Sequence, residues 1–252
     1  MKKLALVVSF IMVSAVFAAA QNAKPWTEWA KKDAEKMLNE SAWGKTQQET
    51  DTSQMIFQPT ANDTTKTTSK ATTDDKGVAS GSNAESGARN GEQALKYHIR
   101  FISAKPVREA FARMIMLNQT NEAAAKALGA KLQAAFVDLD YGDYIVIGVV
   151  PEATDRRQLG PVDQALRSAT APMLKTTCYL ERKDGKRMFL VEYEPPTPDQ
   201  TGAKFIFPRS LEEQPFLTEG ETVRFVAEVG DKVKVNMKYK MADMKFEGKL
   251  EY

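Results

Sequence analysis

The sequence predicts an α+β fold, in which helices pack on a mixed β-sheet and the chain ends in a three-stranded antiparallel meander. The first observation behind this class is a continuous apolar run over residues 144–150, rich in β-branched side chains and closed by Pro151. Such a run is typical of a strand buried on both faces. The second is helical spacing of apolar residues on either side of the run. The third is a succession of strand and turn patterns from residue 174 onward, an order expected for an α+β domain.

The first twenty residues have the organisation of a secretory signal peptide. Lys2 and Lys3 precede an apolar stretch over residues 4–16, and the alanines at 18–20 offer a small-residue cleavage site. We therefore expect residues 1–20 to direct export to the periplasm or the cell exterior and to be removed. The alternative is an uncleaved membrane anchor, for which the apolar stretch is short. After cleavage we expect no integral membrane span.

The charge balance depends on this leader. The whole chain has 35 basic and 33 acidic residues, a net charge of +2. Lys2 and Lys3 are the only charged residues of the leader, so the remaining chain carries 33 of each sign. Non-specific nucleic-acid binding normally requires a basic excess, and we expect no nucleic-acid partner. The single cysteine, Cys178, excludes an internal disulfide, so stability must come from a buried core.

Residues 21–45 are expected to contain a short amphipathic helix. Its apolar stripe follows helical spacing and consists of Trp26, Ala30, Ala34 and Met37. All three tryptophans of the chain lie in this segment, at Trp26, Trp29 and Trp43. Because a helix this short is marginal alone in water, its aromatic side chains must dock on another surface. That surface is either the protein's own domain or an envelope partner, and the three tryptophans are the candidate interaction residues.

Residues 46–93 are expected to form a flexible, low-complexity linker. From Pro59 to Gly91 the chain consists of Thr, Ser, Asn, Asp, Gly, Lys and other small or polar residues, with Val78 as the one larger aliphatic side chain. Such a segment cannot bury enough apolar surface to offset the entropy lost on ordering. The globular domain is therefore placed at residues 94–252.

The first half of this domain alternates strands with helices. Residues 95–101 alternate apolar and polar side chains, as in a half-buried strand. Pro106 is expected to begin a helix, and a second helix covers residues 122–136. After the central strand, Gly160 and Pro161 are expected to start a further helix.

The second half of the domain is expected to be β-structure. Residues 174–181 and 188–194 flank a turn at 183–186 and predict a hairpin. Three segments that alternate apolar and polar side chains, except at Val226, then predict the meander. They are residues 223–229, 233–239 and 244–252. The lysines on its outer side are expected to form a solvated face that discourages edge pairing. An anion-binding face is the alternative interpretation of these lysines.

The sequence offers no residue with a strong claim to catalysis. The single histidine, His98, is expected on the polar side of its strand, between Lys96 and Arg100. Two neighbouring cations lower the pKa of a histidine, and the sequence provides no carboxylate to orient the ring. Cys178 alternates in phase with Leu180 and is expected to lie in the core as an unreactive thiol.

No metal or cofactor site is predicted either. The acidic cluster at residues 138–143 lacks the spacing of a calcium-binding loop, and we interpret it as the turn between a helix and the central strand. Gly142 and Gly148 do not begin a phosphate-binding loop of the strand–loop–helix type.

Three stretches resemble a family of uncharacterised bacterial exported proteins. They are the double-tryptophan helix Trp-Thr-Glu-Trp at 26–29, with Asn-Glu-Ser-Ala-Trp at 39–43; Phe-Ile-Phe-Pro-Arg at 205–209; and the C-terminal stretch at 244–252, which ends in Gly-Lys-Leu-Glu-Tyr. The resemblance implies export and a single architecture. It implies no activity, ligand or catalytic residue.

These observations favour a non-enzymatic exported protein that binds a ligand or has a structural role in the periplasm or cell envelope. One alternative is an exported carboxylate-dependent hydrolase, which requires a deep pocket and an Asp or Glu of perturbed pKa. Another is a subunit of a larger envelope complex, attached through the tryptophan-rich helix and presenting an exposed apolar patch.

Overall fold

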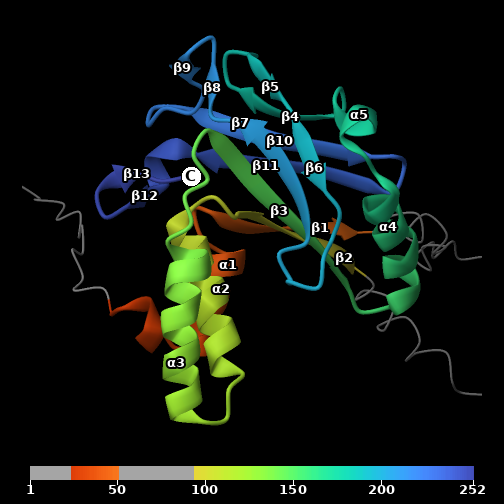
Figure 1. Cartoon of the computed structure of the whole chain (residues 1–252). Coiled ribbons are helices and arrows are strands. Elements are labelled where there is room, and N and C mark those ends of the chain that lie inside the picture. Colours follow the sequence, from red (N-terminus) through yellow and green to blue (C-terminus); the bar gives the residue numbers. More distant parts are fainter. Residues whose placement is uncertain (1–23, 51–93) are drawn as a thin grey trace, which may run out of the picture.

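The computed structural model describes residues 24–50 and 94–252 (Figure 1). The expected signal peptide and most of the expected linker lie outside these residues. The predicted α+β class is confirmed, because helices pack around antiparallel sheets in the described part of the chain. None of its helices is long and apolar enough to span a membrane.

The larger sheet has five strands in the order β1-β2-β3-β7-β6, and all its pairings are antiparallel. Strand β3 occupies the centre, and its residues 145–149 are buried. The apolar run predicted to be a buried strand is therefore the middle of the sheet. The strands are β1 (Gly44–Thr50), β2 (Ala94–Phe101), β3 (Tyr144–Ala153), β6 (Glu192–Glu194) and β7 (Ala203–Pro208).

The second sheet has four antiparallel strands in the order β11-β10-β4-β5. Its inner face packs on the larger sheet through edge-to-face aromatic pairs, among them Phe205 with Phe225 and Phe101 with Tyr239. Such pairs join burial of large rings to a favourable ring geometry. The strands are β4 (Cys178–Arg182), β5 (Arg187–Phe189), β10 (Thr222–Val229) and β11 (Val233–Lys240).

The two sheets are joined along both sides. On one side the chain crosses from β5 to β6, where the amide of Leu190 bonds to the second sheet and that of Val191 to the first. On the other side, side chains of β1 bond to the backbone edge of β11. Lys45 Nζ donates to the carbonyl of Lys238 at 2.7 Å, and Gln47 Nε2 donates to that of Lys234 at 2.7 Å. Polar groups that an edge strand leaves unpaired are thereby satisfied.

We expect Gln47→Ala to lower the free energy of unfolding by about 1 kcal/mol, because two hydrogen bonds to the edge of β11 are lost. The second of these runs from the Asn236 amide to Gln47 Oε1 at 2.8 Å. Urea denaturation measures the change. Gln48→Ala is the matched control, since Gln48 is exposed on the same strand. Equal stability of the two variants would contradict the role of Gln47.

The helices cover the sides of the larger sheet. In Figure 1, α2 and α3 form an antiparallel hairpin with α1 beside it, and α4 lies apart from them at the right, against β3 and β11. The helical elements are η1 (Trp26–Glu28), α1 (Lys31–Asn39), α2 (Lys105–Leu117), α3 (Glu122–Leu132), η4 (Gln133–Val137), α4 (Arg156–Ser168), α5 (Ala171–Leu174) and η5 (Met241–Asp243). Short hairpins complete the fold, made of β8 (Ser210–Leu211), β9 (Gln214–Pro215), β12 (Lys245–Phe246) and β13 (Lys249–Leu250).

The N-terminal segment differs from the continuous helix that the spacing of its apolar residues predicted. Trp29 and Ala30 have extended backbone angles, so a single 3-10 turn precedes α1. The buried residues of α1 are Ala34 and Leu38, and Met37 is half-buried. The break lets Trp26 reach a different surface from that contacted by α1.

Several boundaries in the β-rich half also differ from those expected. Residues 46–50, expected as linker, continue strand β1. Leu174, expected to begin a strand, ends helix α5, and the strand begins at Cys178. Helix α4 begins at Arg156 rather than at Gly160, because the Asp155 carboxylate caps it by accepting from the Arg157 amide.

The third strand of the expected meander is absent from the described second sheet. Residues 245–250 instead fold into the β12–β13 hairpin, with Glu247 and Gly248 in left-handed conformations at the turn. The outer edge of β11 is already contacted by Lys45 and Gln47 of β1. The apolar side chains of the segment still point inward, and Met244 and Tyr252 are buried.

Candidate functional site

A cavity of about 540 Å³ lies on the outer face of the second sheet. Strand register places Arg224 of β10 between Glu181 of β4 and Lys238 of β11. Because side chains alternate across a sheet, the buried Val223 and Phe225 direct Arg224 to the outer face. The cavity extends over this row toward the β4–β5 turn, where Lys183 and Gly185 line it.

One carboxylate holds two arginines in this row. Arg187 Nε donates to Glu181 Oε1 at 2.8 Å, and an Arg224 guanidinium NH2 group pairs with Glu181 Oε2. These hydrogen bonds, that of Arg224 first, hold the pKa of Glu181 below its usual value. Two guanidiniums around one carboxylate leave a net positive charge, and the Arg224 side chain is fixed in place before a ligand arrives.

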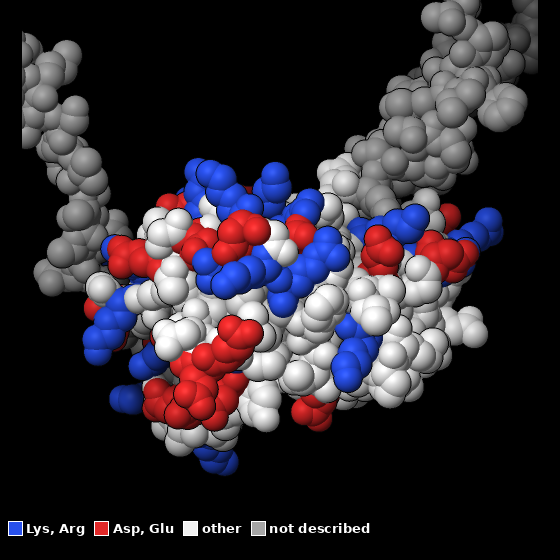
Figure 2. Space-filling model, turned by 90° about the horizontal axis from the view of Figure 1, so that it is seen from above, with Lys and Arg blue, Asp and Glu red and all other residues white. Residues whose placement is uncertain are grey.

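Two ammonium groups complete the cationic lining. Lys183 and Lys238 form no ion pair with any acidic side chain that the structure describes. The hydroxyl-bearing Thr222 lies on the same lining. Seen from above, basic side chains gather in a band across the molecule with acidic ones among them (Figure 2). The neighbouring guanidiniums of Arg182, Arg187 and Arg224 are already paired with carboxylates, whereas these two lysines are not.

Arg182 forms a fixed wall of the cavity. Its guanidinium bonds to Glu221 at 2.6 Å and to Asp184 at 3.1 Å, and it lies over the Phe216 ring at 5.8 Å. Its charge is consequently compensated by two carboxylates. The positive charge available to a ligand comes from the ammonium groups of Lys183 and Lys238 and from the guanidinium of Arg224.

This arrangement is suited to holding an anion. Its volume lies within the range of roughly 300–1,000 Å³ that small-molecule sites occupy. Ammonium and guanidinium groups form charge-assisted hydrogen bonds with carboxylates and phosphates. The alternation of lysines along 233–239 signalled an outer basic face, and Lys238 is one of them. Lys183, Arg224 and Glu181 were missed, because only strand pairing brings them together.

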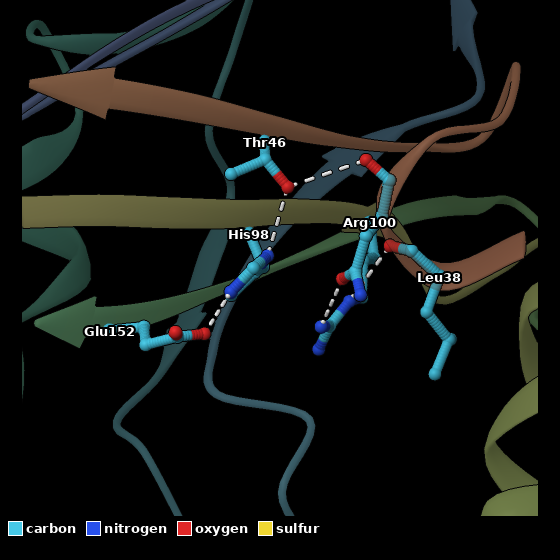
Figure 3. A network of polar contacts seen from close by, with 6 residues as sticks. Leu38, Thr46, His98, Arg100 and Glu152 are labelled. Carbon is cyan, nitrogen blue, oxygen red and sulfur yellow. Dashed lines mark hydrogen bonds and ion pairs between the residues drawn. The ribbon is translucent and has the colours of Figure 1, made fainter. Parts of the chain in front are cut away.

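His98 lies in a second polar cluster, on the larger sheet. Its Nε2 is 2.6 Å from Glu152 Oε2 and its Nδ1 is 3.0 Å from Thr46 Oγ1, so the imidazole joins three neighbouring strands (Figure 3). The expectation that no carboxylate orients His98 is wrong, because β3 pairs with β2 and brings Glu152 beside it. Burial lowers the pKa of His98. The positive charges of Arg100 and Lys96 lower this pKa further, whereas Glu152 opposes the shift.

The same face holds a buried arginine that anchors the N-terminal segment. Arg100 Nε donates to the Leu38 carbonyl at 3.0 Å, and a guanidinium NH2 group donates to Asn39 Oδ1 at 2.7 Å (Figure 3). Burial lowers the pKa of Arg100 to about 10, which leaves it charged at neutral pH. Thr46 also bonds to the Asn39 carbonyl at 3.3 Å. The cluster thus ties α1 and β1 to the sheet and has a structural role.

The three tryptophans lie against the protein's own domain, one of the two alternatives left open by the sequence. Trp26 is buried beside Met116 and Val137, and its indole donates to Gln133 Oε1 at 2.8 Å. Trp43 is buried in the main core and donates to the Glu251 carbonyl at 2.7 Å. Trp29 is half-buried and donates to the Lys24 carbonyl at 2.9 Å.

The remaining candidate groups lie apart from the cavity. Cys178 is buried, and burial raises the pKa of its thiol to about 11. Glu109 of α2 is 8% exposed, and burial raises its pKa to about 7. It is the perturbed carboxyl that a hydrolase would need, but it does not line this cavity. Across the residues with described positions, no group of three or more His, Cys, Asp or Glu could hold a metal ion.

Comparison with known proteins assigns no family to the chain. No family model and no curated protein matches it. A crystal structure of a DUF4426 family protein from Pseudomonas aeruginosa is similar over 59% of this chain and 86% of its own, with 16% sequence identity and a TM-score of 0.24. A similarity of this size carries no argument about fold or function.

Proposed function

We propose that this chain is a non-enzymatic binding protein of the periplasm or cell envelope, and that it binds a small anion in the cavity over β4, β10 and β11. The observation that carries the proposal is the pair of unpaired ammonium groups, Lys183 and Lys238, beside the oriented guanidinium of Arg224. Export is proposed from residues 1–20, which lie outside the described residues.

The charges favour binding over catalysis at this site. A carboxylate or phosphate placed between the two lysines gains charge-assisted hydrogen bonds without breaking the pair of Arg224 and Glu181. The cavity is open to water, so each contact is screened and contributes modestly. Glu181 is held as a carboxylate by two arginines, which makes it a poor general acid or base near neutral pH.

The test is a titration of the protein with inorganic phosphate, followed by amide chemical shifts in NMR spectra. We expect shifts to concentrate at Lys183, Thr222, Arg224 and Lys238, with a dissociation constant in the millimolar range and weaker binding at higher salt. Lys238→Ala is expected to weaken binding roughly 5- to 10-fold, equivalent to about 1 kcal/mol.

Lys234→Ala is the matched control for this experiment. Lys234 is exposed on the same strand and face but does not line the cavity. We expect less than a 2-fold change in affinity, because one solvated charge at this distance is largely screened. If Lys234→Ala and Lys238→Ala weaken binding equally, phosphate responds to the overall charge and the proposed site is wrong.

A further inference from the structure

An apolar row lies beside the cationic row on the same face of the second sheet. Tyr179 of β4 is opposite Phe189 of β5 on one side and Val226 of β10 on the other. These residues are two positions along their strands from Glu181, Arg187 and Arg224, so the alternation of side chains places both rows on one face. Phe189 is 42% exposed, which leaves much of its ring open to contact.

Arg187 joins the two rows. Its guanidinium lies 4.4 Å from the centre of the Tyr179 ring, while its Nε donates to Glu181 at 2.8 Å. Tyr179 and Phe189 pack edge to face with ring centres 5.9 Å apart. Arg187 therefore contacts Tyr179 of the apolar row and Glu181 of the cationic row at the same time.

The spacing between the rows sets the size of a ligand that would contact both. Neighbouring strands lie about 4.8 Å apart and each residue advances about 3.3 Å along a strand. Phe189 is two strands and two residues from the Arg224 position, which corresponds to roughly 12 Å. Val191, two residues after Phe189 where the chain crosses to the larger sheet, is also exposed, at 50%. Exposed apolar side chains that adjoin a charged cavity are typical of binding sites.

We propose that the ligand is a small amphiphilic anion, with its phosphate or carboxylate between Lys183 and Lys238 and an apolar chain or ring across Tyr179 and Phe189. This inference rests on the proposed function and specifies the class of ligand. Charge complementarity selects the anionic end, and the exposed ring of Phe189 beside the half-buried Tyr179 selects the apolar end.

The experiment compares inorganic phosphate with octyl phosphate, used below its micelle-forming concentration, by isothermal titration calorimetry. We expect octyl phosphate to bind at least 10-fold more tightly than phosphate. Phe189→Ala is expected to reduce this ratio to about 3-fold or less, because part of the apolar contact is lost. Leu211→Ala, which removes a 37% exposed apolar side chain on β8, is the control and should leave the ratio unchanged.

The outcomes separate this inference from the proposed function. If phosphate binds and Lys238→Ala weakens it, but octyl phosphate binds no more tightly, the amphiphilic ligand is wrong and the anion site stands. If neither compound binds, both proposals are overturned. Binding to phosphatidylglycerol vesicles without binding of free octyl phosphate would identify a membrane surface and contradict a small-molecule ligand.

Discussion

Replacing Trp43 by alanine is expected to lower the free energy of unfolding by about 3–5 kcal/mol, the usual cost of removing a large buried aromatic ring. Trp43 is 7% exposed, packs edge to face on Phe246 at 6.5 Å, and donates its indole hydrogen to the Glu251 carbonyl at 2.7 Å. It thus joins the N-terminal segment to the C-terminal hairpin. Urea denaturation followed by far-ultraviolet circular dichroism measures the loss.

Two further variants separate the contributions of Trp43. Trp43→Phe keeps an apolar ring and removes the indole hydrogen bond, so a smaller loss of about 1–2 kcal/mol is expected. Trp29→Ala is the matched control, since Trp29 is half-buried and its indole bonds only to the nearby Lys24 carbonyl. If Trp43→Ala costs no more than Trp29→Ala, the N-terminal segment does not depend on the core contact described above.

The variant Glu109→Gln is expected to be more stable than the natural protein at pH 8 by up to about 3 kcal/mol. Burial raises the pKa of Glu109 from 4.5 to about 7, and Glu247 adds to the shift while Lys105 and Arg108 oppose it. The glutamine amide retains the shape of the protonated acid and carries no charge. The variant is expected to be more stable because a buried carboxylate that lacks enough paired charges and hydrogen bonds destabilises the folded state.

The direction of the pH dependence follows from this raised pKa. The folded state binds the Glu109 proton more tightly than the unfolded state, so its stabilising effect is complete below pH 4.5 and is lost as the pH rises through about 7. The difference in stability between Glu109→Gln and the natural protein should therefore be small at pH 4 and largest at pH 8. Denaturation at both pH values measures it.

An exposed glutamate provides the reference for this comparison. Glu192→Gln, on the exposed side of β6, is expected to change stability by less than about 0.5 kcal/mol at either pH. If Glu109→Gln gains the same stability at pH 4 and at pH 8, the pKa of Glu109 is not raised by burial in the folded protein. The expectation for Glu109 would then be wrong.

Elements that depend on the local spacing of apolar residues or on turn residues could be predicted from the sequence. The apolar run at 144–150 could be a strand only if both faces were covered, and β3 is the central strand of its sheet. The alternating segments on either side of Gly230 predicted the β10–β11 hairpin, because alternation places the apolar side chains of both strands on one face. The two-residue turn suggested by Gly230 and Asp231 is wrong, since Val229 pairs with Val233 and three residues, 230–232, form the turn. The helix beginning near Pro106 was readable for a similar reason, since proline favours a first helical turn.

Elements and contacts that depend on polar groups far apart in the sequence could not be predicted from it. Strand β1 contains no large aliphatic side chain, and its register depends on β2 together with bonds from Lys45 and Gln47 to β11. The pairing of His98 with Glu152 joins residues far apart in the sequence. Neither contact leaves a periodic signal, so composition assigned residues 46–50 to a linker and left His98 without a carboxylate.

By itself the sequence determined the α+β class, the buried central strand and the outer position of the lysines on β11, because each follows from the spacing of apolar and polar side chains along one segment. The tertiary structure decided which segments meet. Antiparallel pairing of β4, β10 and β11 brings Glu181, Arg224 and Lys238 into one row, and the β4–β5 turn adds Lys183. The candidate anion site exists through these non-local pairings, whose register is set by packing of the two sheets.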